Sequence, residues 1–296
     1  MFVMFTPYSF IFFSLYSVTF VLCLLIGNFY YYWMVMELIM LLFMGLSYTL
    51  FVSSYSQLMS YFLIQAISSF SILISFMHSY MFLFTVSLLL KLSMFPFYAW
   101  YINVIYRFPN FIFWLSGTLH KLPLLIMMFN FSLSLNMNLI WLSIVFTTLL
   151  SGFMMLMVVD LRMLLVLSSV GNNSWLLISQ MTDLFSFLTF FTVYSFSLLM
   201  LLFSFSGLSK FPSYTSVGSD NYFLSMWVVS LSGMPPLPLF FSKMIVLFSF
   251  IGVHSMNYLF ILFLLSNSLM VMAYLQSIMK FFVYSFSTSS HLLLKL

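Results

Sequence analysis

Four ionisable residues stand deep inside long apolar segments, where a charge is costly. They are Glu37 in MVMELIM, Lys91 in LLLKLSM, Lys121 in GTLHKLP and Lys243 in LFFSKMI. A charge at the centre of a bilayer costs roughly 2.5–3.5 kcal/mol on insertion scales, so such residues must face the protein interior, a partner or water. Burial favours the neutral form of a lysine, whereas a nearby carboxylate favours the charged form. Because a lysine can switch between these forms and an arginine stays protonated, we predict that these four residues transfer protons.

Structural roles for the same residues are the alternative. Glu37 and Lys91 could form a fixed ion pair, and a lysine near the end of a span could reach the headgroups. One carboxylate does not neutralise three lysines, which weakens a purely static pairing. His120, next to Lys121, could relay protons or could be a neutral, packed imidazole.

The composition requires lipid as the solvent for most of the chain. The 296 residues are 64% hydrophobic and 4% charged, against roughly 25% charged residues in a soluble domain. The single cysteine, Cys23, excludes disulfides within the chain and iron–sulfur ligation. The scattered basic residues form no patch for nucleic acid. The fold expected is therefore an all-α polytopic membrane protein forming one transmembrane domain over residues 1–296, and the N-terminal segment, which has no basic n-region, is expected to be a retained first span.

Ten apolar segments are long enough to cross a bilayer, which takes about 20 residues. The fourth and the ninth are unusually long and carry prolines near their middle: Pro96 in the fourth and SLSGMPPLPLFFSK, 230–243, in the ninth. Since proline removes a backbone donor, both helices should be discontinuous. The ten predicted spans are 6–26, 29–52, 58–77, 80–106, 110–129, 138–158, 163–181, 184–206, 222–252 and 257–281.

A broken helix in the fourth place of each group of five predicts two inverted five-helix repeats, 6–129 and 138–281, as in antiporters. Proline-interrupted segments at matching places in two halves point to a transport site. Backbone groups freed at the breaks need water or polar partners, so we expect water beside Lys91 and Lys243. The polar run SSVGNNSW, 168–175, and the residues around Asn267 could line a water path or form interhelical hydrogen bonds.

Basic residues in the connections predict the orientation. The ends on the N-terminal side carry Arg107, Arg162, Lys210, Lys280 and Lys295, whereas the opposite ends carry no Lys or Arg. The positive-inside rule then puts the N-terminus in the matrix or cytoplasm. Asp160 and Arg162 are expected to form a surface pair that contributes little to stability.

Several short motifs together resemble a known family. They are Glu37 in the second span, YFLIQA at 61–66, KLSMFPFYAW at 91–100, HKLP at 120–123, LRMLLVLSSVGNNSW at 161–175 and SLSGMPPLPLFFSKM at 230–244. The chain resembles the chain 2 family of mitochondrial NADH–ubiquinone oxidoreductase, respiratory complex I, of an invertebrate type such as the nematode one.

The resemblance implies a proton-translocating, antiporter-like subunit of this respiratory-chain translocase. Glu37 and Lys91 would be the glutamate–lysine pair, Lys121 the central relay lysine and Lys243 the terminal lysine. The chain itself would bind no redox cofactor, metal or nucleic acid, while the complex uses FMN, iron–sulfur clusters, NADH and ubiquinone. Its partners would be other membrane subunits of complex I and phospholipid. It would lie in the mitochondrial inner membrane with its N-terminus on the matrix side.

Two other functions are compatible with the same residues. A stand-alone cation/proton antiporter would use them in the same way, and a membrane scaffold without transport would use them only for structure. Replacing Glu37 and Lys91 together by apolar residues would leave activity intact only in the scaffold, because swapping a buried pair is often tolerated.

Overall fold

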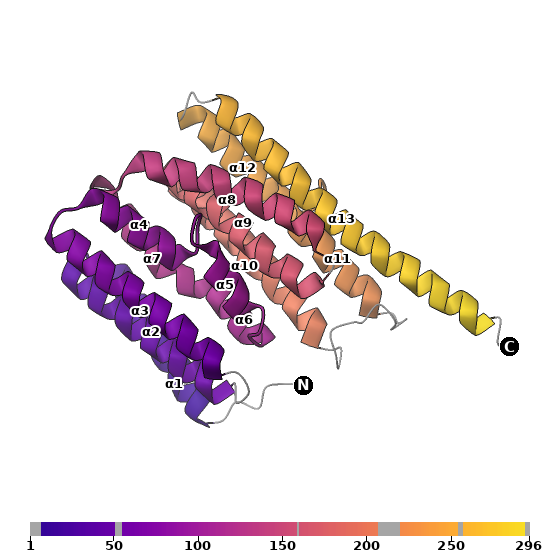
Figure 1. The fold of residues 1–296 in the computed structure, drawn as a ribbon, viewed down its shortest axis with the longest axis horizontal. Coiled ribbons are helices and arrows are strands. Elements are labelled where there is room, and N and C mark those ends of the chain that lie inside the picture. Colours follow the sequence, from indigo (N-terminus) through magenta and orange to yellow (C-terminus); the bar gives the residue numbers. More distant parts are fainter. Residues whose placement is uncertain (1–6, 51–54, 159, 207–219, 254–256, 294–296) are drawn as a thin grey trace. The chain divides into compact units, whose positions relative to one another are not determined.

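The computed structural model describes residues 7–50, 55–158, 160–206, 220–253 and 257–293. Every regular element within these ranges is helical (Figure 1). Eight helical segments of this part of the chain are long and apolar enough to cross a membrane, and two shorter apolar helices, Met81–Leu92 and Pro238–Gly252, belong to the interrupted segments. The predicted all-α polytopic membrane fold is confirmed, and each of the ten predicted spans corresponds to a helix or to a broken helix.

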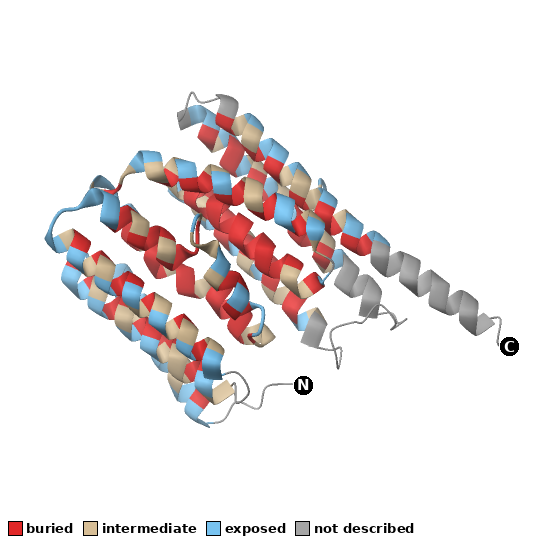
Figure 2. Cartoon of the chain, in the orientation of Figure 1, coloured by how far each residue is buried: buried red, intermediate tan, exposed pale blue. Residues whose placement is uncertain are grey.

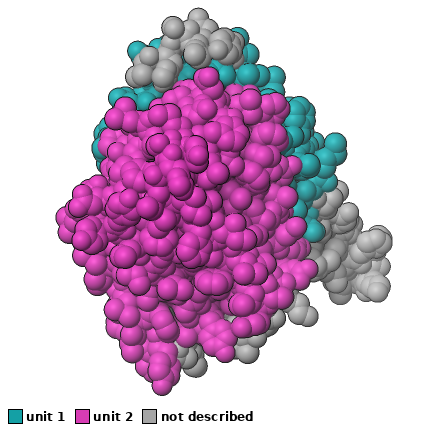
Figure 3. All heavy atoms as spheres, turned by 60° about the vertical axis from the view of Figure 1, so that its left-hand side comes forward, with its two compact units in different colours: residues 1, 148–296 teal, residues 2–147 magenta. Residues whose placement is uncertain are grey.

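The chain divides into two compact units, residues 2–147 and residues 148–296, which we call the N-terminal and C-terminal units (Figure 3). The division falls within helix α8 (Met137–Met157). The inverted-repeat relation of 6–129 to 138–281 stays a prediction.

The described residues of the N-terminal unit form seven α-helices, two short 3₁₀ turns and the start of α8. Helix α3 packs against α2, α4 and α5, and α7 packs against α1 and α4. The elements are α1 (Pro7–Leu25), α2 (Phe29–Leu50), α3 (Tyr55–Met77), α4 (Met81–Leu92), α5 (Tyr98–Ile105), α6 (Asn110–Gly117), η1 (Leu119–Lys121), α7 (Leu122–Asn130) and η2 (Ser132–Ser134).

Aromatic side chains close one end of this unit. The rings of Phe29 and Phe76 stack with their centroids 3.5 Å apart, and Phe84 and Phe131 pack around them. Rings from α2, α3, α4 and the residue after α7 therefore meet in one apolar cluster, which large rings fill efficiently in a chain with so little alanine.

The C-terminal unit surrounds one deeply buried helix, α9 (Leu161–Thr182). Helix α9 packs against α10, α12 and α13, and its residues from Leu164 to Ser179 are all buried (Figure 2). Its packing partners include Phe190, Phe250 and Phe263, whose rings form a cluster with Trp175. The other helices are α10 (Leu184–Ser206), α11 (Asp220–Ser232), α12 (Pro238–Val253) and α13 (Asn257–Leu293).

Helices approach closely at Gly171 of α9. A Cβ atom built on Gly171 would overlap Cε of Met270 and lie 2.7 Å from Oγ of Ser151, so these side chains would have to shift. Small residues let membrane helices approach in this way. The polar run at 168–175 therefore lies where helices meet, and whether it also lines water stays a prediction.

The predicted breaks in the fourth and ninth segments are confirmed. The first separates α4 from α5, and the second separates α11 from α12. At the first, Ser93 takes the left-handed conformation with φ 59°, and the amide of Met94 donates to the carbonyl of Leu89 at 2.9 Å, which ends the helix. At the second, Gly233 takes the same region with φ 76°.

The fifth and tenth predicted spans, 110–129 and 257–281, match the membrane-length segments Asn110–Asn130 and Leu259–Met279. The fifth is interrupted in a way that the sequence did not predict, because Thr118 leaves the helical conformation (φ −125°, ψ −82°) and a 3₁₀ turn, η1, precedes α7. Pro123 tolerates this since proline is favoured in the first turn of a new helix. The last helix continues to Leu293 instead of ending at 281.

Candidate functional site

Glu37 and Lys91 meet in the N-terminal unit, as the sequence predicted. The Nζ atom of Lys91 lies 3.6 Å from Oε1 of Glu37, and their side chains are 3% and 21% exposed within this chain. This separation is longer than the 2.7–2.9 Å or so of a direct charge-assisted hydrogen bond. Neither atom has a hydrogen-bond partner among the described residues. The two groups are therefore an ion pair at close range that leaves room for other polar contacts.

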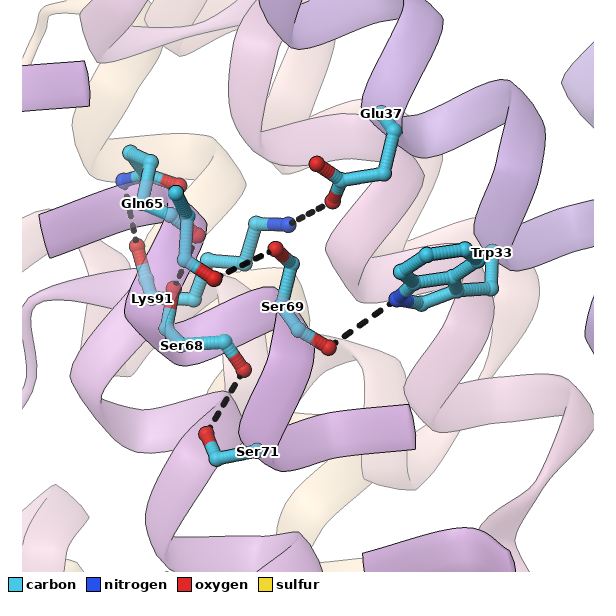
Figure 4. Close-up of polar contacts among 8 residues, drawn as sticks. Trp33, Glu37, Gln65, Ser68, Ser69, Ser71 and Lys91 are labelled. Carbon is cyan, nitrogen blue, oxygen red and sulfur yellow. Dashed lines mark hydrogen bonds and ion pairs between the residues drawn. The ribbon is translucent and has the colours of Figure 1, made fainter. Parts of the chain in front are cut away.

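Four polar residues of α3 lie beside this pair: Gln65, Ser68, Ser69 and Ser71 (Figure 4). The Gln65 amide nitrogen donates to the backbone carbonyl of Lys91 at 3.4 Å, and the indole of Trp33 donates to the carbonyl of Ser69 at 2.9 Å. Lys91 is in the last turn of α4, where carbonyls lack partners within the helix. Gln65 thus satisfies one of these carbonyls and ties α3 to the broken end of α4.

Lys121 lies in η1, inside the break that the sequence did not predict. It is 4% exposed, and its Nζ stands over the ring of Tyr101 of α5, 4.6 Å from the centroid. The break and the lysine coincide because the 3₁₀ turn ends at Lys121 itself.

His120 is buried between aromatic rings. Its imidazole lies 4.7 Å from the ring of Phe43 and 6.0 Å from that of Tyr61, measured between centroids. Its Nδ1 has no hydrogen-bond partner among the described residues. Both interpretations of His120, relay and packed neutral imidazole, remain open.

Lys243 lies in the C-terminal unit, 2% exposed, among four helices. From α12 its Nζ donates to Oδ1 of Asn267 on α13 at 2.7 Å and stands 5.4 Å from the ring centroid of Trp175 on α9. A Cβ built on Gly233, directly after α11, would lie 3.3 Å from the same Nζ. The lysine therefore reaches back across the break to the end of α11.

The sequence identified the four charges and the pairing of Glu37 with Lys91, but not the other contacts of these residues. Gln65 was noted only within a motif, and Asn267 only as a polar residue of open role, while Tyr101 and Trp175 were not singled out. Polar residues inside spans were the available signal for the first two. Nothing in sequence spacing marks which ring faces which lysine.

The remaining predictions concern metal ligation and the charged residues at the ends of the spans. Within the described ranges no group of three or more His, Cys, Asp and Glu residues could hold a metal ion. Arg107 follows α5 and Asp160 and Arg162 adjoin the start of α9, as expected for residues at the ends of spans. Lys210 and Lys295, and the side chain of Lys280, lie outside the described residues, so the orientation stays a prediction.

Chains of solved respiratory membrane complexes share this fold of broken helices. A chain of respiratory complex I from Thermus thermophilus has a similar fold, with a TM-score of 0.68 and 16% identity over 84% of this chain and 64% of that one. A chain of the membrane-bound sulfane sulfur reductase, an archaeal respiratory membrane complex, is similar at a TM-score of 0.68 and 13% identity over 83% and 60% of the two chains.

Curated relatives then bear a particular name, NADH-ubiquinone oxidoreductase chain 2. The chain of Albinaria caerulea is 29% identical over 76% of this chain and 73% of its own length, and that of Aedes aegypti is 26% identical over 66% and 58%. The chain of Gallus gallus is 28% identical over 55% and 49%. No family model matches the sequence. The resemblance predicted from the motifs is confirmed, and this chain spans between half and three-quarters of the length of these relatives.

Proposed function

We propose that this chain is a proton-translocating, antiporter-like membrane subunit of an NADH:ubiquinone oxidoreductase. The names of the relatives and the fold shared with complex I support the assignment. The observation that carries the mechanism is the buried Lys91–Glu37 pair at the broken end of α4. The enzyme is a translocase as a whole, and this chain contributes proton transfer without a redox centre of its own.

Within the N-terminal unit, proton transfer begins from the separation of two charges. With Glu37 at 3.6 Å, Lys91 is held as an ammonium ion. When the carboxylate moves away, the ammonium group loses its counter-charge in a low-dielectric interior and gives its proton to a neighbouring base or water. Return of the carboxylate restores the charged form. The 21% exposure of Glu37 gives its side chain room for this movement.

Lys121 and Lys243 are the further carriers in this proposal. Each is almost fully buried and each adjoins a helix break, where unpaired backbone groups attract water. The redox energy that drives the cycle comes from the complex, whose FMN, iron–sulfur clusters, NADH and ubiquinone lie on other chains. Other membrane subunits and phospholipid cover the exposed apolar faces, in the mitochondrial inner membrane with the N-terminus on the matrix side.

Replacement of the lysines by methionine tests the proposal. In the assembled complex, Lys91→Met and Lys243→Met should each lower coupled NADH–quinone turnover and proton pumping by tenfold or more, as expected for loss of a general acid–base group, which contributes about 10²–10⁴-fold. Lys280→Met is the matched control, since we expect that lysine at the membrane surface. Unchanged pumping per electron and an unchanged rate in both variants would contradict the proposal.

A second measurement distinguishes the proposed function from that of a stand-alone cation/proton antiporter. The purified chain in liposomes should exchange no cation for protons, because the proposal places its driving force in the complex. Cation-dependent proton exchange by the isolated chain would favour the antiporter instead.

A further inference from the structure

Among the described residues, Lys121 and Lys243 each lie against an aromatic ring. Residues 2–147 include one acidic residue, Glu37, beside two buried lysines, Lys91 and Lys121. The Glu37 carboxylate lies with Lys91 at 3.6 Å. A buried ammonium group needs compensation for lost hydration, and an aromatic face beside Lys121 is one source of it.

The ring of Tyr101 lies against the ammonium group of Lys121. Lys121 Nζ lies 4.6 Å from the centroid of the Tyr101 ring, and both side chains are nearly inaccessible. A cation within about 6 Å of a ring centroid is attracted by the negative face of the ring, and the attraction is strongest where both groups are desolvated.

The C-terminal unit has the same arrangement with a different ring. Lys243 Nζ lies 5.4 Å from the centroid of Trp175, and its one hydrogen-bond acceptor described here, Oδ1 of Asn267, is uncharged. Asp160 and Asp183, which flank α9, are exposed at its two ends. Trp175 is fully buried and held by the rings of Phe190 and Phe263, and its indole nitrogen has no hydrogen-bond partner among the described residues. Packing alone thus fixes the orientation of this ring toward the lysine.

We propose that Tyr101 and Trp175 are positioning residues whose ring faces stabilise Lys121 and Lys243 as cations. A ring cannot accept the proton or swing away like Glu37, so each lysine keeps a fixed, moderate bias toward its charged form. When the ammonium group passes its proton to a water molecule, a neutral amine remains and the ring is unchanged. The role in proton transfer rests on the proposed function, whereas the effect of the rings on lysine charge does not.

Lysine NMR on the full chain tests the inference without requiring activity. The sequence has six lysines, at 91, 121, 210, 243, 280 and 295, so selectively labelled side chains in lipid nanodiscs give few signals. Tyr101 is replaced by phenylalanine and then by ring-fluorinated phenylalanines, which keep the shape while weakening and reversing the negative ring face. Trp175 is replaced by fluorinated tryptophans in the same manner.

We expect a graded response confined to the lysine that faces the altered ring. Tyr101→Phe should leave the ratio of charged to neutral Lys121 close to native, and full fluorination should lower that ratio roughly tenfold at a given pH, a change equivalent to about 1.4 kcal/mol. Lys91 serves as internal control, because its partner is a carboxylate. A charge ratio of Lys121 or Lys243 that does not change across its series would overturn the inference for that lysine.

Turnover of the assembled complex separates this inference from the proposed function. If fluorination shifts the charge of Lys121 and Lys243 while turnover and pumping stay native, the rings do control the lysines but the lysines do not transfer protons. If the charge ratio is unmoved, the inference fails whatever the turnover.

Discussion

The broken helices of the two units have a similar backbone at the break, but the lysine precedes the break in one unit and follows it in the other. In the N-terminal unit a left-handed Ser93 ends α4, and the amide of Phe97 donates to the carbonyl of Met94 at 2.7 Å before α5 begins. In the C-terminal unit a left-handed Gly233 follows α11, and the amide of Leu237 donates to the carbonyl of Met234 at 3.0 Å before α12 begins. Lys91 precedes its break by two residues, whereas Lys243 follows its break by ten.

The difference teaches that the break, and not the position of the lysine in sequence, is what the two units have in common. Lys91 belongs to the last turn of α4, and the side chain of Lys243 returns to Gly233 at the end of α11. Both lysines are thus associated with the carboxyl end of the first half-helix, where the helix dipole favours a cation. They differ in the partner there: a carboxylate at Lys91, and an amide and a ring at Lys243.

Removal of the carboxylate should produce the largest effect on stability. Glu37→Leu leaves a buried ammonium group without its counter-charge and should lower the free energy of unfolding by roughly 3–5 kcal/mol. Glu37→Leu combined with Lys91→Leu removes both charges and should restore most of that loss. Reversible unfolding in mixed micelles measures both, and a double variant as unstable as the single one would show that the pair does not act as a unit.

Loss of the amide partner in the C-terminal unit should matter less. Asn267→Leu removes a hydrogen bond to a charged donor, which is equivalent to about 1.5–3 kcal/mol. Asn267→Asp sharpens the comparison, because it gives Lys243 the kind of partner that Lys91 has. We expect this second variant to be at least as stable as the native chain and slower in coupled turnover, measured in the same preparation. Faster turnover would contradict a role for the weak amide partner.

A smaller effect on stability is expected at the left-handed residue of each break, which is Gly233 in one unit and Ser93 in the other. Gly233→Ala places a side chain at φ 76°, at a cost of about 1–2 kcal/mol, and 3.3 Å from Nζ of Lys243. Ser93→Ala is the matched control, since Ser93 already carries a Cβ atom in that conformation. Thermal unfolding should therefore detect Gly233→Ala and show little change for Ser93→Ala. Equal shifts for both would mean that proximity to the lysine has no influence.

The smallest effect is expected at the α3 contact of the first break. Gln65→Leu removes the 3.4 Å bond to the Lys91 carbonyl, and a neutral hydrogen bond contributes about 0.5–1.5 kcal/mol. Because the bond is long, the loss should fall at the low end of that range, as read from the unfolding midpoint. A loss as large as that of Glu37→Leu would place Gln65 in the ion-pair network itself.

Much of this architecture is predictable from the sequence because lipid imposes strict rules. Segment length and proline position predicted the spans and both breaks. The cost of isolated charges offered Glu37 and Lys91 as a possible pair, which the family resemblance also implied. The break at Thr118 was missed, since no proline interrupts that segment before Pro123 and a 3₁₀ turn leaves no compositional mark. The ring partners of Lys121 and Lys243 depend on packing between helices, which one sequence does not encode as a spacing.

Helix α13 is longer than the hydrocarbon layer of a membrane is thick. Its 37 residues span about 55 Å at 1.5 Å per residue, while the hydrocarbon layer is about 30 Å thick. Tilt shortens the excess but does not remove it, so several turns of this rod must project into headgroups, water or a docking partner. The projecting portion is a helical extension that the hydrocarbon layer does not cover.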